Sequence, residues 1–321
     1  MKNTNQRISA GRRVAIIGAG MAGMVCASRL SAAGFAVTVF EKSRGLGGRL
    51  ATRRADALSF DHGAPSFGAT SEPFRAFVDE LSNGPKASIS FWAEAPGLQA
   101  FVGLPSMNAL LKPLAELVSV NFSKTVANAE KDADGWRLHL KDEDPTGTYD
   151  YLGVAVPAPQ AIEIVHEAAV AAGASEARYA PCWTTLLACA PDALPDNPAP
   201  DADLFSAVIA NDTKPGRPQG LAQIVLHARP VWSKANLEHE KDEIARTMAD
   251  AYFNGATPEL QHLAGHRWRY AFVEEPAGLQ PAFDKAQKIG FAGDWRRGPT
   301  VEDAFYSGVE LADGIIEAAS A

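Results

Sequence analysis

The alternation of hydrophobic and polar positions is clearest near the N-terminus. An apolar, β-branched run over residues 13–17 is followed by a glycine-rich turn, an apolar segment of helical length and a second apolar run over 35–40. Two short apolar runs separated by a helix-length segment are typical of a strand–helix–strand unit in a parallel sheet. The first part of the chain therefore predicts an α/β fold.

Farther along, the hydrophobic period changes several times. The spacing of apolar residues predicts helices over 72–81, 106–117 (bent at Pro113) and 158–172. Short strands are predicted over 88–92, 99–102, 118–122, 124–131, 136–141 and 149–156. The Asp134-Gly135 pair favours a hairpin turn between two of these strands, so this part forms a small antiparallel sheet beside the first unit.

The composition changes near Ala180, where prolines begin to separate short extended runs. Strands are predicted over 184–190, 204–210, 221–227 and 266–273, with one helix over 237–253 and a loose acidic loop over 192–203. This order of elements favours an antiparallel sheet. The chain then returns to a strand–turn–helix pattern, with a strand over 288–292 and a helix over 299–318.

These elements divide into two domains. We expect a Rossmann-type nucleotide-binding domain made of residues 13–75, 104–175 and 276–321. A substrate domain with a mixed or antiparallel sheet is expected to be inserted in it, from residues 76–103 and 176–275. Residues 1–12 are polar and are expected to form a loose N-terminal tail.

Composition and charge narrow the function classes. The chain has 321 residues, of which 46% are hydrophobic and 21% charged, as in ordinary globular proteins. Its net charge of −8 disfavours a nucleic-acid partner or an anionic membrane surface. No apolar run reaches the length of a membrane span, and the N-terminus lacks the apolar core of a signal peptide, so a cytoplasmic location is expected. Cys26, Cys182 and Cys189 lack metal-ligand spacing, so neither a disulfide framework nor a metal site is expected.

The glycine-rich turn carries the first chemical signal. Gly18, Gly20 and Gly23 form a G-x-G-x-x-G pattern between the first strand and the first helix. The first glycine allows the tight turn, the second lets the backbone approach a pyrophosphate, and the third lets helix and strand pack closely. Glu41 ends the next apolar run, where an acid can accept hydrogen bonds from a ribose. Together these offsets predict a dinucleotide site rather than a chance glycine-rich turn.

A second glycine-rich segment, residues 42–52, follows directly and also contains Arg44 and Arg49. Its glycines allow backbone to lie against a ligand, and each arginine can present a forked pair of donors to phosphate. A solvated basic loop is the alternative, but the position next to Glu41 favours a role at the nucleotide. Gly293-Asp294 forms a similar turn between the last strand and the last helix, and it is expected to lie beside the first turn.

These motifs together resemble the FAD-dependent amine oxidase superfamily. The shared features are Glu41, the Arg44-x-x-Gly47-Gly48-Arg49 loop, Asp61-x-Gly63-Ala64 and Gly293-Asp294. Further phrases are similar to the renalases and their bacterial relatives, namely Val156-Pro157-Ala158-Pro159-Gln160, Leu226-His227-Ala228, Trp232-Ser233 and His266-Arg267-Trp268-x-Tyr270-Ala271. The resemblance runs along the whole chain and implies a p-hydroxybenzoate-hydroxylase-like fold with non-covalent FAD.

The resemblance also implies which residues hold FAD. Gly18, Gly20, Met21, Ala22 and Gly23 would hold the pyrophosphate, and Glu41 with Lys42 the adenosine ribose. The phosphates and the ribityl chain would be lined by Arg44, Gly48, Arg49 and Asp294, and adenine would meet the backbone of Val126. The flavin ring would lie near Ala64, Pro65 and the helix start at Val301, Glu302 and Asp303. A helix N-terminus there would stabilise the negative charge of the reduced ring.

The activity implied by the resemblance is oxidation of 2- or 6-dihydro isomers of NAD(P)H, with electrons passed to oxygen as peroxide. One departure concerns the substrate side. The family has Gln-Tyr-Phe after its Asp-x-Gly-Ala motif, whereas this chain has Pro65-Ser66-Phe67. The serine is expected to leave space beside the flavin ring and to admit a different substrate.

Hydride transfer from a dihydropyridine requires a flat, dry pocket more than a base. The candidates for its walls are Trp183, Trp232, Trp268 and Tyr270, with His227 and His266 as polar groups and Arg267 and Arg269 as phosphate ligands. Core packing, structural histidines and a solvated strand face are the respective alternatives. Three functions remain open: a renalase-like oxidase using molecular oxygen, an amine or other small-molecule oxidase or dehydrogenase, and a flavin-binding protein without turnover.

Overall fold

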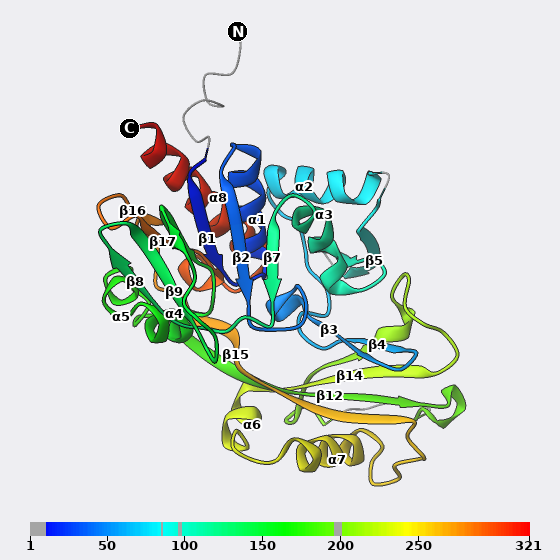
Figure 1. Ribbon diagram of the computed structural model, residues 1–321. Coiled ribbons are helices and arrows are strands. Elements are labelled where there is room, and N and C mark those ends of the chain that lie inside the picture. Colours follow the sequence, from blue (N-terminus) through cyan, green and yellow to red (C-terminus); the bar gives the residue numbers. More distant parts are fainter. Residues whose placement is uncertain (1–10, 85, 96–97, 196–200) are drawn as a thin grey trace.

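The computed structural model describes residues 11–84, 86–95, 98–195 and 201–321, and Figure 1 shows them in two lobes. The upper lobe is built on a six-stranded sheet with the order β16-β17-β11-β1-β2-β7. Its strands are β1 (Arg13–Ile17), β2 (Ala36–Glu41), β7 (Ser119–Phe122), β11 (Tyr151–Val154), β16 (Phe283–Asp284) and β17 (Ile289–Phe291). All neighbouring strands are parallel except β16 and β17. The carboxyl ends of five strands therefore meet at one edge, where open α/β sheets bind ligands.

Helices α1 (Met21–Ala32) and α8 (Val301–Ser320) pack on one face of this sheet (Figure 1). The other face carries α4 (Ala158–Ile164), α5 (His166–Ala171) and a sheet of β8 (Val126–Asp132), β9 (Gly135–Leu140) and β10 (Thr148–Tyr149). Successive residues of a strand point to opposite faces. Accordingly, Val14 and Ile16 of β1 lie in the first core, while Ala15 and Ile17 lie in the second. The lobe thus has three layers.

The lower lobe is an antiparallel sheet with the order β13-β14-β12-β15. Its strands are β12 (Arg178–Cys189), β13 (Phe205–Ala210), β14 (Ala222–Ala228) and β15 (His262–Glu275). Helices α6 (Pro230–Ala235) and α7 (Lys241–Tyr252) cover the face that points away from the upper lobe (Figure 1). In the part of the chain that the structure describes, no helix combines the length and the apolar composition needed to cross a membrane.

Strands β12 and β15 belong to both lobes. They pair from Ala188↔His262 at the lower end to Arg178↔Glu275, and Val273 lies in a core of the upper lobe. The register shifts where Ala180↔Phe272 gives way to Cys182↔Trp268, so residues 269–271 of β15 bulge out beside Pro181. A bulge increases strand twist and redirects side chains. The bulge lies where the strands pass from one lobe to the other.

Several short elements complete the upper lobe or lie between it and the lower one. They are the hairpin β3 (Thr52–Ala55) and β4 (Leu58–Asp61), helix α2 (Glu72–Asn83), the hairpin β5 (Ile89–Ala95) and β6 (Leu98–Gly103), and helix α3 (Lys112–Ala115). Single 3-10 turns occur at η2 (Gly48–Leu50), η3 (Met107–Leu111), η4 (Pro191–Ala193), η5 (Asn211–Thr213) and η6 (Asp294–Arg296). The division into two domains stays a proposal. Within it, Val78, Ile89 and Val102 pack in the core of α1 and α8, which favours moving residues 76–103 to the nucleotide-binding domain.

The predicted α/β fold with a Rossmann-type domain is confirmed, and the second sheet is antiparallel. Some boundaries differ. The helix expected over 158–172 is interrupted at Val165, whose backbone leaves the helical region. The strand expected from 149 divides at Asp150, whose carboxylate accepts a hydrogen bond from the Arg13 backbone N–H. The loose tail expected over residues 1–12 falls mostly outside the described residues, as does the middle of the acidic loop over 192–203.

Candidate functional site: a cavity between the two lobes

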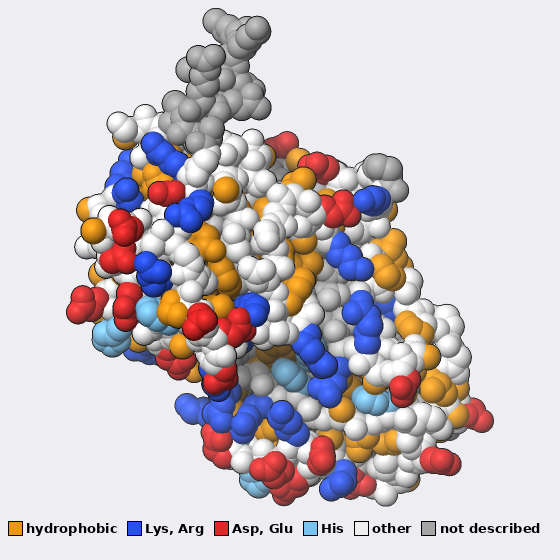
Figure 2. Space-filling view, viewed as in Figure 1, with side chains coloured by type: hydrophobic (Ala, Val, Ile, Leu, Met, Phe, Trp, Pro, Cys, Tyr) orange, Lys and Arg blue, Asp and Glu red, His pale blue; other side chains and the backbone are white. Residues whose placement is uncertain are grey.

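A cavity of about 1360 Å³ extends from the glycine turn of the upper lobe to β14 and β15 of the lower lobe. Figure 2 shows the hollow between the lobes, with Lys and Arg side chains on its sides and a histidine within it. The volume exceeds the roughly 300–1,000 Å³ of most small-molecule pockets. The cavity is therefore large enough for an extended dinucleotide and a second small molecule.

The glycine turn forms one end of the cavity. Gly18 has a positive φ of 105°, and a Cβ there would lie 2.5 Å from the carbonyl oxygen of Ala155. A Cβ on Gly23 would lie 2.0 Å from the oxygen of Gly18. Helix α1 begins directly after Gly20, and no side chain caps its N-terminus. Unpaired backbone N–H groups and the positive end of the helix dipole are thus available to a phosphate group.

Glu41 ends β2 and is buried beside this turn. Its carboxylate accepts hydrogen bonds of 2.8 Å from the backbone N–H groups of Ala19 and Ser43. Glu41 therefore joins the glycine turn to the Gly/Arg loop. The side chain also lines the cavity, where carboxylate oxygens retain further lone pairs for a ribose.

The Gly/Arg loop lies against the Asp61-x-Gly63-Ala64 turn. The Ala64 N–H donates to the carbonyl of Arg49 at 2.9 Å, and a Cβ on Gly63 would lie 1.9 Å from the same oxygen. The two motifs meet because glycine leaves room for backbone against backbone. On the other side of the loop, the Gly47 N–H donates to Ala19 O at 3.0 Å.

Arg49 and Asp294 span the middle of the cavity. Two parallel hydrogen bonds of 2.5 and 2.6 Å join the guanidinium to the carboxylate. Burial acts to lower the pKa of Arg49, but the Asp294 carboxylate outweighs it and raises that pKa. Gly293-Asp294 follows β17, so this pair joins the last glycine turn to the Gly/Arg loop. Both partners present polar atoms to any molecule that runs from the glycine turn toward the lower lobe.

Helix α8 points its N-terminus at the cavity, with Val301 on the wall. Thr300 and Asp303 form a capping box: the Asp303 N–H donates to Thr300 Oγ1 at 3.0 Å, and the Thr300 N–H donates to Asp303 Oδ2 at 3.1 Å. The Glu302 side chain instead accepts hydrogen bonds from the N–H groups of Thr70 and Ser71, each at 2.9 Å. Glu302 therefore fixes the segment before α2.

An aromatic and histidine cluster forms the lower-lobe end. The ring centroids of His62 and Trp268 are 5.2 Å apart and those of His266 and Trp268 are 4.4 Å apart. Trp268 Nε1–H donates to the carbonyl of His62 at 2.9 Å. Burial lowers the pKa of His62 and of His227 to about 4. The pKa of His266 is lowered to about 3, by burial and by the neighbouring His62 and Arg53. The three imidazoles are therefore neutral near pH 7.

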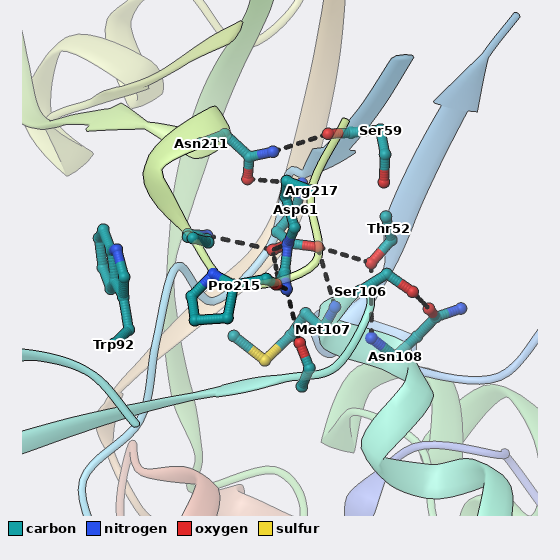
Figure 3. A network of polar contacts seen from close by, with 12 residues as sticks. Thr52, Ser59, Asp61, Trp92, Ser106, Met107, Asn108, Asn211, Pro215 and Arg217 are labelled. Atoms are coloured by element: carbon teal, nitrogen blue, oxygen red, sulfur yellow. Dashed lines mark hydrogen bonds and ion pairs between the residues drawn. The ribbon is translucent and has the colours of Figure 1, made fainter. Parts of the chain in front are cut away.

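Directly behind this cluster is a buried ionic network (Figure 3). Asp61 at the end of β4 accepts hydrogen bonds from Lys214 Nζ and Arg217 Nε, both at 3.1 Å, and all three side chains have 0% exposure. Thr52 Oγ1 and the Met107 N–H donate to the other carboxylate oxygen at 2.7 and 2.9 Å. Burial alone would raise the pKa of Asp61, but the two cations outweigh it and lower that pKa. One carboxylate thus ties the 214–217 loop of the lower lobe to the turn that faces the cavity.

Most of the residues singled out from the sequence line this cavity. They are Gly18, Gly20, Met21, Ala22, Glu41, Lys42, Arg44, Gly48, Arg49, Ala64, Pro65, Val126, His227, His266, Arg267, Trp268, Arg269, Tyr270, Asp294 and Val301. Gly23 lies behind the turn and Glu302 faces the segment before α2. Ser66, expected to leave space at the flavin, is not on the wall, and Pro65 is.

Two tryptophans were expected in the pocket and do not reach it. Trp232 packs against the core under α7, so its placement in the pocket is wrong. Trp183 is fully buried in the same core, with Nε1–H donating to the Asn236 carbonyl at 2.9 Å. Sequence reasoning also missed His62, Arg53 and Lys241 on the cavity wall. Of these, only His62 had a local signal, since it lies inside the Asp61-x-Gly63 motif.

The parallel sheet with its glycine turn and terminal acid defines a Rossmann-type dinucleotide-binding domain, here joined to a second lobe of antiparallel sheet. Residues 16–81 match the family of NAD(P)-binding Rossmann-like domains. A 4,4'-diapophytoene desaturase (4,4'-diaponeurosporene-forming) of Staphylococcus haemolyticus (strain JCSC1435) is 37% identical over 67 residues, which are 21% of this chain and 13% of the desaturase. A zeta-carotene-forming phytoene desaturase of Myxococcus xanthus is 45% identical over 53 residues, 16% of this chain and 10% of that enzyme.

Two solved structures share the fold over nearly the whole chain. A protein from Exiguobacterium sp. 255-15, provisionally named protoporphyrinogen oxidase, has a TM-score of 0.69 at 14% identity, covering 96% of this chain and 99% of that one. An oxidoreductase from Methanosarcina mazei has a TM-score of 0.63 at 14% identity, covering 94% of this chain and 100% of that one. The desaturase matches span only about a tenth of those enzymes and about a fifth of this chain or less. None of these relatives is a renalase, and that finer resemblance remains a proposal.

Proposed function

We propose that this protein is an FAD-dependent oxidoreductase that takes a hydride from a small planar substrate. The observation that carries the proposal is the single cavity that connects the glycine turn to the wall of Trp268 and Tyr270. FAD supplies the two-electron acceptor in such enzymes. The residues fit it, because the uncapped N-terminus of α1 after Gly20 can take a pyrophosphate and Glu41 is placed for a ribose.

The chain's own groups then have defined tasks. Arg49 and Asp294 would hold the linker between the dinucleotide and the ring, one as donor and the other as acceptor. The N-terminus of α8 at Val301 would stabilise negative charge on the ring. Trp268 and Tyr270 would orient a flat substrate and exclude water. The FAD would be non-covalent: Cys182 is the one described cysteine on the cavity wall, and burial raises its pKa to about 11, so little reactive thiolate forms.

As the particular reaction we propose oxidation of a 2- or 6-dihydro isomer of NAD(P), with molecular oxygen as the electron acceptor, as in bacterial renalases. A dihydropyridine is already a hydride donor, so the enzyme has only to align it. This fits a lower-lobe wall whose histidines are neutral and weakly basic. Oxidation of an ammonium substrate would instead require its deprotonation, and the cations on this wall disfavour binding it.

The test is anaerobic mixing of the FAD-loaded protein with dihydronicotinamide isomers and, separately, with primary amines. Rapid bleaching of the flavin absorbance by the isomers alone is the expected result. Bleaching by amines alone would replace the proposed substrate with an amine, and no bleaching by any donor would leave a flavin-binding protein without turnover. Gly23→Ala serves as the matched control, since it should remove FAD and with it every absorbance change. A protein that rejects added FAD would refute the whole proposal.

A further inference from the structure

Positive charge is concentrated at the lower-lobe end of the cavity. Arg53 and Arg54 of β3, Lys241 of α7, and Arg267 and Arg269 of β15 all line it. Among the described lower-lobe residues of the wall no side chain is acidic. The acids that do line the cavity, Glu41, Glu163 and Asp294, all belong to the upper lobe. This end of the cavity is therefore positively charged, although the protein as a whole has a net charge of −8.

Only part of this charge is neutralised within the protein. Arg267 and Arg269 both pair with Glu238, at 3.3 and 2.8 Å. The side chains of Arg53 and Lys241 are exposed and have no ion pair or hydrogen bond to any residue that the structure describes. The phosphates of a dinucleotide would lie at the glycine turn after β1, whereas Arg53 belongs to β3 and Lys241 to α7. Arg53 and Lys241 are therefore free to attract a different anion.

The floor of this end holds unpaired polar atoms. His62 and His227 are 7% and 5% exposed, and His62 Nδ1 and His227 Nε2 have no hydrogen-bond partner. Both rings line the cavity. His62 Nδ1 and His227 Nε2 themselves have almost no accessible surface, so the remaining nitrogen of each ring is the one that a ligand in the cavity can meet. Each neutral imidazole has one N–H donor to offer, and the stacked ring of Trp268 provides a flat neighbour.

We infer that a subsite for an anionic group of the substrate, a carboxylate or a phosphate, is formed by His62, His227, Arg53 and Lys241. The ring of that substrate lies against Trp268. The inference rests on the proposed function, because it names the chemistry of the substrate that this cavity takes. The imidazoles donate hydrogen bonds to the anion and the two cations offset its charge. A substrate that ends in an ammonium group is excluded by the same cations.

The test is calorimetric titration of the FAD-loaded protein with four ring compounds: benzoate, phenyl phosphate, benzamide and benzylammonium. We expect one or both anions to bind, with benzamide and benzylammonium at least about tenfold weaker, which is 1.4 kcal/mol. Preference for benzoate or for phenyl phosphate identifies the natural anion as carboxylate or phosphate. Equal binding of benzamide and benzoate, or no binding of either anion, would overturn the inference.

Variants separate the subsite from general effects. Lys241→Met and Arg53→Met should each raise the dissociation constant of the bound anion about fivefold or more, and His227→Leu should do the same. Arg246→Met is the matched control, because Arg246 is exposed on the same helix as Lys241 and does not line the cavity. Equal effects of Arg246→Met and Lys241→Met would contradict a specific subsite.

The two proposals fail in distinguishable ways. If no donor bleaches the flavin but the anions still bind, with the same effects of the variants, the subsite is retained and the proposed reaction is refuted. Bleaching by dihydronicotinamides in protein that binds neither anion would do the reverse.

Discussion

The buried network around Asp61 offers a sharp test of the fold. Asp61→Asn keeps the shape of the side chain and keeps an oxygen for the hydrogen bonds from Thr52 and Met107. It replaces the other oxygen with an N–H₂ donor, which would face Lys214 Nζ and Arg217 Nε. The two fully buried cations would then have no anion between them, and the N–H₂ group of asparagine would point at the N–H groups of Lys214 and Arg217.

The magnitude follows from that geometry. Removing one partner of a buried ion pair costs about 3–5 kcal/mol, because the remaining charge stays buried without compensation. An unfolding entropy of about 2.1 cal/mol/K per residue gives roughly 0.7 kcal/mol/K for 321 residues. The expected decrease in Tm is therefore about 4–7 °C.

Thermal unfolding followed by circular dichroism measures this decrease. Glu116→Gln is the matched control, because it removes one partner of the exposed Glu116–Lys86 pair and should cost at most about 1 kcal/mol. The double variant Asp61→Asn with Lys214→Met should be more stable than Asp61→Asn alone, since it leaves one unpaired cation instead of two. If Asp61→Asn and Glu116→Gln lower Tm equally, the network does not stabilise the fold in the way described.

Three further outcomes are expected. Gly23→Ala should abolish FAD binding in an absorbance titration, because its Cβ would lie 2.0 Å from a backbone oxygen of the glycine turn; unchanged FAD content would contradict that geometry. Glu41→Ala should raise the dissociation constant of FAD by about tenfold or more, given roughly 1.5–3 kcal/mol for a hydrogen bond to a charged group, whereas Glu167→Ala should not, because Glu167 is exposed and does not line the cavity. Stability to urea should fall as the pH decreases from about 6.5 to about 4, since the folded-state pKa of His62 and His227 is near 4 and the unfolded chain takes up protons at higher pH. The loss of stability should be smaller in the variant in which both histidines are replaced by glutamine. An equal loss in that variant would show that other groups cause the pH dependence.

The nucleotide-binding half was predictable because its signals are local. Gly18 and Gly23 each have a steric reason that the sequence motif itself indicates, and Glu41 follows at the offset that the strand–helix–strand unit requires. The strands of the lower sheet were also found, with ends displaced by a few residues. Strand β12 begins at Arg178, because its pairing with β15 continues past Pro181. The local sequence around Pro181 does not predict this pairing.

The floor of the candidate site could not be predicted, since it depends on contacts between distant segments. Lys214 and Arg217 lie in a proline-rich loop whose composition is typical of an exposed turn. They are buried only because Asp61, more than a hundred and fifty positions earlier in the chain, lies against them. Trp232 shows the opposite error: an aromatic residue beside a family-like phrase packs in the core.

The two strands shared by the lobes bear on how this protein can be re-engineered. β12 and β15 pair from the outer sheet into the core of the nucleotide-binding lobe, and the bulge at 269–271 places Tyr270 on the cavity wall. A chimera that exchanges the outer lobe for that of a relative cannot be joined at a flexible linker, because at this point the chain crosses as paired strands. The chimera has to keep residues 178–181 together with 269–275 from this protein. The exchanged sheet then keeps the bend of these strands and the orientation of the wall that faces the substrate.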